Sequence, residues 1–212
     1  MNSWPIPVLW PGAAAVVVAG GPSLDLAQIR HVARARLEEQ CRVIAVNDAV
    51  YPCWFGDWLH ACDGKWWTWH RLTATKFPGV RTTCTETVPE SWAHYIRVLP
   101  PDRETGLKTG FADEPDALVG GGNGGYQAIQ IAVKAGARRV ILLGLDMKFG
   151  AGGKAHFFGD HPDHIRSDYD GTILPNFPGL ADALKARGIE VINCSPNSAL
   201  TCFPMARLED VL

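Results

Sequence analysis

Short apolar runs alternate with longer amphipathic stretches along this chain. Ala13–Ala19 is a valine-rich run with the length and composition of a buried parallel strand. In Leu24–Glu39, apolar residues recur at helical spacing, which predicts a helix. Arg42–Val46 is a second apolar run. This order of strand, helix and strand is the repeating unit of a parallel sheet.

The same alternation continues towards the end of the chain. Further strands are expected at Trp58–Cys62, Gly79–Thr85, Tyr95–Leu99, Arg139–Leu143 and Ile189–Asn193. Helices are expected at Lys65–Thr75, Tyr126–Ala135 and Leu174–Arg187, with a last helical turn at Arg207–Val211. Two stretches without periodicity, 100–118 and 147–171, are expected to be surface excursions, the first of them a candidate lid.

The pattern predicts one α/β domain covering residues 1–212, without internal repeats. Its sheet is expected to be doubly wound and mostly parallel, with helices on both faces, as in a Rossmann-like, GT-A-like single domain. Such sheets bind ligands outside the carboxyl ends of their strands, at the point where the strand order reverses. Functional side chains are therefore expected directly after the predicted strands.

Composition and charge narrow the classes of function. The residues are 47% hydrophobic and 20% charged, and the formal net charge is −2, so no strong signal for nucleic-acid or acidic-membrane binding is present. We see no membrane span and no signal peptide, and expect a cytoplasmic protein. The six cysteines form no CxxC pair, so reduced thiols are expected rather than a zinc site. The sequence carries no signal for an oligomeric state.

Five of the eight tryptophans lie between Trp54 and Trp69. A buried aromatic cluster is the favoured interpretation. The alternative is a platform on which a base or a sugar ring stacks.

Two glycine-rich loops lie next to predicted helices. Gly20–Ser23 follows the first predicted strand, and Gly120–Gly125 precedes the helix predicted from Tyr126. Glycine lets the backbone approach a ligand closely, and the unpaired amides at a helix start favour an anion, so both loops are predicted to hold phosphate. The alternative is a plain turn in which Ser23 or Asn123 caps a helix. Neither loop has the Lys-Ser/Thr pair of a P-loop. The candidate phosphate-binding residues are Gly20, Gly21, Pro22, Ser23, Gly122, Asn123 and Gly124.

Four polar side chains follow other predicted strands. Asn47 and Asn197 carry amides that can bind a base edge or a ribose hydroxyl, or can simply form turns. Asp63 and Asp146 can hold a divalent metal together with phosphates, or can cap helices and bond loops.

The second excursion carries the candidate catalytic groups. Its three histidines are His156, His161 and His164, and imidazole can act as an acid or a base near neutral pH. His161 is the first choice of catalytic base, because an aspartate precedes it, and His156 is the second. Lys148 and Lys154 can bring positive charge to a leaving phosphate. The alternatives are a loop of solvated side chains, or metal ligation by two of the histidines.

Taken in order, these motifs resemble a known group of proteins. VVVAGGPSL resembles the Gly-Pro-Ser-Leu opening of bacterial sialyltransferases of glycosyltransferase family 42 and of the related DUF115 group, which includes 6-hydroxymethylpterin diphosphokinase. VIAVNDA, GGNGGYQAIQIAVKAGARRVILLGLDM and INCSPNSALTCF resemble later segments of the same group. The matches span Val16 to Phe203, and the chain is most similar to small phage-borne members.

The resemblance to family 42 implies a nucleotide-sugar donor that binds without an essential metal. The residues that it implicates in binding are Gly21, Pro22, Ser23, Asn47, Asn123 or Gly124, and the turn of Pro196, Asn197 and Ser198. The chain departs from the family at two places. Lys148 and Lys154 stand at the offsets of two tyrosines that assist the departing phosphate, and Gly171 stands near the position of the histidine base.

We therefore expect a transferase that uses a nucleotide-activated donor, in the first place a nucleotide-sugar glycosyltransferase without a cofactor. The acceptor is left open. One alternative is a diphosphokinase-like phosphoryl transfer from ATP, with magnesium held by Asp63 and Asp146. Another is a non-catalytic protein that binds or sequesters a nucleotide. Magnesium dependence separates the first two, and binding without product would favour the third.

Overall fold

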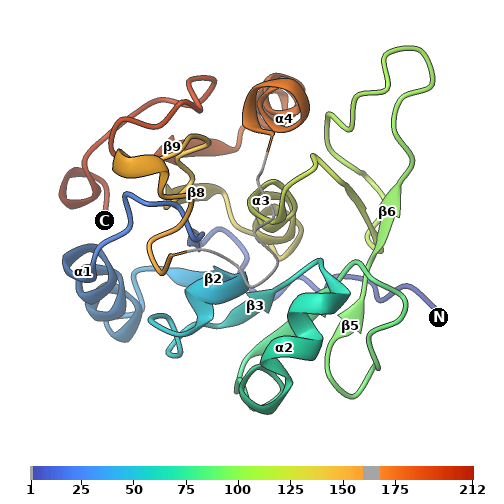
Figure 1. Ribbon diagram of the computed structural model, residues 1–212, viewed down its shortest axis with the longest axis horizontal. Coiled ribbons are helices and arrows are strands. Elements are labelled where there is room, and N and C mark those ends of the chain that lie inside the picture. The colour runs from blue at the N-terminus through green and yellow to red at the C-terminus, as the bar shows by residue number, and fades with distance from the viewer. Residues whose placement is uncertain (1, 160–167) are drawn as a thin grey trace.

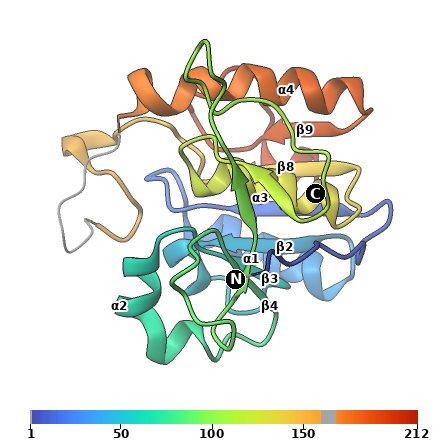
Figure 2. The same cartoon turned by 90° about the vertical axis from the view of Figure 1, so that its right-hand side faces the viewer.

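A seven-stranded sheet forms the centre of the computed structural model, which describes residues 2–159 and 168–212 (Figure 1). Its strand order is β5-β4-β3-β2-β1-β8-β9, and every pairing is parallel. Helices cover both faces, and α4 and α2 lie on opposite sides of the sheet in Figure 2. The predicted α/β, Rossmann-like fold is therefore confirmed.

The elements of the main sheet and its helices follow the predicted order. The strands are β1 Ala14–Val18, β2 Arg42–Val46, β3 Trp58–His60, β4 Val80–Thr83, β5 His94–Tyr95, β8 Arg139–Leu143 and β9 Glu190–Asn193. The helices are α1 Leu26–Leu37, α2 Gly64–Ala74, α3 Gly124–Lys134 and α4 Phe177–Ala186. Short 3-10 segments lie at Asn47–Val50, Ala151–Gly153, Leu174–Asn176 and Leu208–Asp210, and a π-helical turn lies at Tyr169–Ile173.

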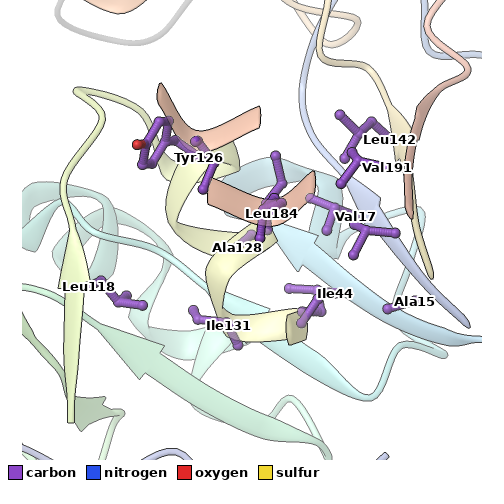
Figure 3. Packing of buried hydrophobic residues seen from close by; sticks show 14 of the residues in the cluster. Ala15, Val17, Ile44, Leu118, Tyr126, Ala128, Ile131, Leu142, Leu184 and Val191 are labelled. Carbon is purple, nitrogen blue, oxygen red and sulfur yellow. The ribbon is translucent and has the colours of Figure 1, made fainter. Parts of the chain in front are cut away.

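Each face of the sheet has its own hydrophobic core, as expected when helices cover both faces of a parallel sheet. Ala15 and Val17 of β1 belong to one cluster with Ala128 of α3 (Figure 3). Val16 and Val18 point to the opposite face and belong to a second cluster with residues of α1 and α2. The unbroken apolar runs of the sequence therefore reflect burial on both sides.

The tryptophans between β2 and α2 are mostly structural. Trp58, Trp66 and Trp67 are buried, as the favoured interpretation predicted. Trp54 and Trp69 keep more than a third of their surface exposed.

The strand order reverses at β1. From β1 the chain adds β2, β3, β4 and β5 on one side, and it returns later to place β8 and β9 on the other side. Val18, the last residue of β1, lies opposite Ala45 of β2 and Leu143 of β8. The segments that follow β1 and β8 therefore border a crevice at the carboxyl edge, where such folds bind ligands.

The predicted strand Tyr95–Leu99 is wrong as a single element. Tyr95 pairs with β4 in the main sheet, whereas Arg97–Leu99 forms β6 of a second, two-stranded sheet with β7, Ala117–Val119. The break falls at Ile96, which is fully buried and donates its N–H to Thr83 O at 2.8 Å. The first excursion, residues 100–118, thus ends in a strand that was not predicted from the sequence.

Other boundaries also differ from expectation. The helix predicted from Leu174 begins as a 3-10 turn and becomes α4 only at Phe177, where Pro178 occupies a first-turn position. The helix predicted from Leu24 begins at Leu26, and Asp25 caps it. Within the described ranges, no helix is both long and apolar enough to cross a membrane.

Candidate functional site: a pocket where the strand order reverses

A pocket lies at the carboxyl ends of β1, β2 and β8. Its walls come from the segments after these strands, from the start of α3 and from the 147–171 excursion. The predicted site residues that line it are Gly20, Gly21, Asn47, Asn123, Gly124, Asp146 and His156. Five segments of the chain thus meet in one place.

The carboxylate of Asp146 fixes the loop that follows β1. Ser23 Oγ donates to Asp146 Oδ2 at 2.9 Å, and the Ser23 backbone amide bonds to the same carboxylate. The Gly21 N–H donates to Gly144 O at 2.8 Å. Because Pro22 has no N–H and the Gly21 N–H is used, these two positions offer no amide to a phosphate. Burial raises the pKa of Asp146, although its hydrogen bonds to Ser23 oppose that shift.

Asn47 lines the pocket and carries an unpaired acceptor. It follows β2 directly and adopts a positive φ of 52°, which asparagine tolerates better than most residues. Its Oδ1 atom is buried and has no hydrogen-bond partner among the described residues. Buried acceptors are rarely left unpaired, so this atom indicates a donor group that a ligand brings.

Asp48 links the pocket to α2. Its Oδ2 accepts a hydrogen bond from Trp66 Nε1 at 2.9 Å, and its Oδ1 lies 3.6 Å from His70 Nε2. His70 Nδ1 in turn lies 2.5 Å from the Tyr51 hydroxyl. This buried carboxylate is held by α2 and stays at the pocket wall.

The start of α3 supplies the positive end of a helix dipole. Asn123 is the N-cap, and its Oδ1 accepts hydrogen bonds from Gly125 N at 2.8 Å and from Tyr126 N at 3.3 Å. Gly124 and Gly125 form the pocket wall and present backbone rather than side chain. Since the first turn carries no acidic residue, the dipole field at this end is open to an anion.

The second excursion covers the pocket. The Phe157 N–H donates to Gly20 O at 2.9 Å, which fixes this loop on the segment after β1. His156 and Phe158 stack with ring centroids 5.0 Å apart, and both line the pocket with Tyr169. An imidazole and a phenol therefore lie beside the buried carboxylate of Asp146.

Several predicted residues lie elsewhere. Lys148 and Lys154 are exposed and do not line the pocket, although the charge of Lys148 lowers the pKa of Asp146. His161, the first choice of base, and His164 lie outside the described residues. Gly122 precedes the α3 cap but is not part of the pocket wall. The first excursion contributes no described residue to this pocket.

The turn after β9 has a structural role. Ser198 Oγ donates to Leu145 O at 2.6 Å, and the Ala199 N–H donates to Asp146 O at 2.8 Å. Pro196 and Asn197 are exposed and lie outside the pocket wall. Through these hydrogen bonds, the turn holds the backbone of the segment after β8.

Asp63 and Asp146 are not brought together. Asp63 is exposed and caps α2, because its side chain accepts a hydrogen bond from Lys65 N at 2.8 Å. β3 and β8 are separated by β2 and β1, which corresponds to about 14 Å at roughly 4.8 Å per strand. A metal ion needs ligands within about 2.6 Å, so these two carboxylates are too far apart to share one ion.

Three residues of the pocket wall that carry acidic or aromatic side chains were not predicted as site residues. Asp48 was overlooked beside Asn47, although both directly follow β2. Phe158 and Tyr169 belong to the excursion that we read as polar. An aromatic residue beside glycine and histidine in a long loop is the signal that could have found them.

Comparison with known proteins supports the fold. No protein-family model matches the chain, and no curated protein matches it. Among solved structures, it is similar to the MAf glycosyltransferase from Magnetospirillum magneticum AMB-1, with a TM-score of 0.63 and 12% sequence identity. The match covers 100% of this chain and 36% of that one, so this chain spans about a third of that glycosyltransferase. At this identity the likeness shows a shared fold.

Proposed function

We propose that this protein is a transferase that uses a nucleotide-activated donor, in the first place a nucleotide sugar. The observation that carries the proposal is the pocket itself. It combines a helix N-terminus without acidic residues in its first turn, the unpaired Oδ1 of Asn47 and the imidazole of His156. The helix N-terminus suits an anion, and the oxygen of Asn47 suits a hydrogen-bond donor on a ribose or a nucleobase. The imidazole suits a hydroxyl group that loses its proton. The similarity to a glycosyltransferase structure is consistent with this choice.

In this proposal, the donor phosphate lies at the start of α3 rather than on the loop after β1. The Gly21 amide of that loop is used within the protein, Pro22 has no amide, and the carboxylate of Asp146 would repel a phosphate there. The side-chain oxygen of Asn47 accepts a hydrogen bond from the sugar or base of the nucleotide. The loop after β1 then serves to position Asp146.

The transfer step needs a base and a leaving group. His156 takes the proton from an acceptor hydroxyl, whose oxygen attacks the anomeric carbon of the donor sugar. The bond between that carbon and the phosphate oxygen breaks, and the nucleotide leaves with both electrons of the bond. The dipole of α3 stabilises the negative charge of the nucleotide. The resemblance to family 42 makes cytidine monophosphate with a sialic acid the first donor to test.

The experiment is a thermal-unfolding screen against nucleotides and nucleotide sugars, with either EDTA or magnesium, followed by an assay for donor consumption. A ligand at about one hundred times its Kd adds about 2.7 kcal/mol, which raises the Tm of a domain of this size by roughly 5–10 °C. We expect such a shift in EDTA as well as in magnesium. A shift with ATP that needs magnesium would support phosphoryl transfer instead. Binding without consumption of any donor would support a sequestering protein, and no shift with any nucleotide would contradict the proposal.

A further inference from the structure

Two half-buried cysteines lie side by side where β3 and β4 end. These strands are paired with His60 opposite Thr82, and Cys62 and Cys84 each follow two residues later. The Ala61 N–H donates to Thr82 O at 3.1 Å, which continues the pairing beyond the strands. Neighbouring strands are about 4.8 Å apart, and disulfides join Cα atoms about 4.4–6.8 Å apart. The backbone spacing therefore suits a disulfide.

Both sulfur atoms contact one side-chain amide, that of Gln127 in α3. Gln127 Nε2 lies 3.7 Å from the Cys62 sulfur, and Gln127 Oε1 lies 3.8 Å from the Cys84 sulfur. The orientation of this amide is fixed, because Nε2 also donates to Gly120 O at 3.1 Å. A carbonyl oxygen can only accept, so the nitrogen must face it. The two cysteines thus have different partners.

A buried histidine, His60, binds the oxygen atom of the Gln127 side-chain amide. His60 Nε2 lies 2.8 Å from Gln127 Oε1, so this nitrogen must carry the proton. The other ring nitrogen, Nδ1, lies 3.0 Å from Thr82 Oγ1, which donates to it. Full burial lowers the pKa of His60 to about 4, so the ring is neutral at physiological pH. A carbonyl oxygen has two lone pairs, so Oε1 accepts from both His60 Nε2 and the Cys84 thiol, whereas Nε2 of the same amide donates to the sulfur of Cys62.

This arrangement makes the two thiols unequal. The hydrogen bond from Cys84 lowers the pKa of Cys62 to about 7 against the opposing effect of burial, and Gln127 adds to the lowering. The charge of the neighbouring Asp63 acts in the opposite direction. The pKa of Cys84 is raised well above its usual value, because it donates to Cys62 and is buried. One sulfur therefore becomes a thiolate near neutral pH while its neighbour keeps its proton.

We propose that Cys62 and Cys84 form a reversible redox pair, in which Cys62 reacts first with a peroxide and Cys84 resolves the product. The Cys62 thiolate attacks one oxygen of hydrogen peroxide, the O–O bond breaks, and hydroxide leaves and is protonated to water. The sulfenic acid on Cys62 is then attacked by the Cys84 sulfur, which releases a second water and leaves a disulfide. The two thiols are oxidised by two electrons and the peroxide is reduced by two.

The test is oxidation of the reduced full-length chain with hydrogen peroxide at neutral pH, followed by alkylation and peptide mass mapping without reductant. We expect a loss of two hydrogen atoms in mass and a peptide pair joined through Cys62 and Cys84. A dithiol reductant should reverse the change. The cysteines that should remain alkylatable are Cys41, Cys53, Cys194 and Cys202. Oxidised protein without the joined peptide would overturn the proposal.

Variants test the order of the steps. Cys84→Ser should stop at a sulfenic acid on Cys62 that dimedone traps, whereas Cys62→Ser should react with peroxide at least about tenfold more slowly. Cys202→Ser is the matched control, because Cys202 is also half-buried but lies outside the pair, and it should behave like wild type. Trapping on Cys84 in Cys62→Ser, at the wild-type rate, would contradict the assigned order.

A measurement on the wild-type chain tests the proposal even if the cysteine variants fail to fold. Burial raises the pKa of Cys202 to about 11, in contrast to Cys62. At pH 7.5, iodoacetamide should therefore alkylate Cys62 at least about tenfold faster than Cys202, after allowance for the higher intrinsic reactivity of the more basic thiolate. Equal alkylation rates would overturn the role of Cys62.

Discussion

At the scale of single residues, Gly21 is required because there is no room for a side chain. A Cβ at this position would collide with the Gly144 carbonyl oxygen and with the carboxylate of Asp146. We expect Gly21→Ala to lower the free energy of unfolding by about 1–3 kcal/mol, since backbone atoms must move to relieve the overlap. Gly20→Ala is the matched control: its Cβ would meet only side chains, the nearest 3.2 Å away, and should cost clearly less. Urea unfolding of the two variants checks this, and equal stability would contradict it.

His60 should make stability depend on pH. Its folded pKa of about 4 lies below the usual 6.5, so the unfolded chain binds the proton more tightly between these values. Stability from the neutral ring is therefore present above pH 6.5 and is lost as the pH falls towards 4. Between pH 7 and 4.5, we expect wild type to lose about 2 kcal/mol more than His60→Gln in urea unfolding. An equal loss in both proteins would show that His60 does not carry this dependence.

Among the described residues, His156 is the histidine that lines the pocket, and it is the base in our proposal. Once a donor is known, His156→Ala should lower the rate about 10²–10⁴-fold, while the Kd of the donor changes little. Lys154→Ala is the control, because Lys154 lies on the same loop but is exposed and outside the pocket. Single-turnover kinetics measure the effect. A wild-type rate for His156→Ala would assign the base to another residue, with His161 the first to examine.

At the scale of elements, the cap of α3 should serve both the fold and the ligand. Asn123→Ala removes the hydrogen bonds to Gly125 and Tyr126 and should cost about 1 kcal/mol in stability. Asp25→Ala, at the cap of α1, should cost a similar amount, but Asp25 lies outside the pocket wall. Unfolding and nucleotide titration of both variants separate the two roles. We expect only Asn123→Ala to weaken nucleotide binding, and equal weakening would refute a local role.

The elements that the sequence predicted best are those buried on both faces. β2 and β8 match their predicted bounds, because each is a continuous run of four apolar residues after an arginine, which leaves little choice. The boundary between β5 and β6 was missed, because Ile96 is apolar and extends the run without a turn signal. β7 was missed because it has three residues and pairs with a strand about twenty positions earlier. Short strands of this kind depend on distant contacts that no local pattern reveals.

The residues of the candidate site could also be predicted only in part from the sequence. Placing polar residues after strands led to Asn47 and Asp146, because the fold itself brings strand ends to one edge. The pattern did not show that Asp146 would bind Ser23 and so use the donors of the first glycine loop. It also could not show that His156 would reach this edge, since the conformation of a long aperiodic loop is set by packing.

At the scale of the whole molecule, the position of the candidate site follows from the strand order. Because β1 lies between β2 and β8, the segments after three strands and the start of α3 converge on one crevice. The same order keeps Asp63 away from Asp146, so these two carboxylates are too far apart to share one ion. The redox pair of Cys62 and Cys84 lies at the same carboxyl edge, after β3 and β4.

The central claim is that a nucleotide binds in this crevice, and calorimetric titration of wild type and Asn47→Gly in EDTA tests it most directly. Glycine accepts the positive φ of Asn47 without strain, so the variant removes the side-chain amide and leaves the backbone unstrained. We predict that at least one nucleotide or nucleotide sugar binds wild type, and that Asn47→Gly raises its Kd about tenfold, the loss of one hydrogen bond. The Tm of the free variant should change little. Unchanged affinity in a folded Asn47→Gly protein, or no binding of any nucleotide to wild type, would contradict the account.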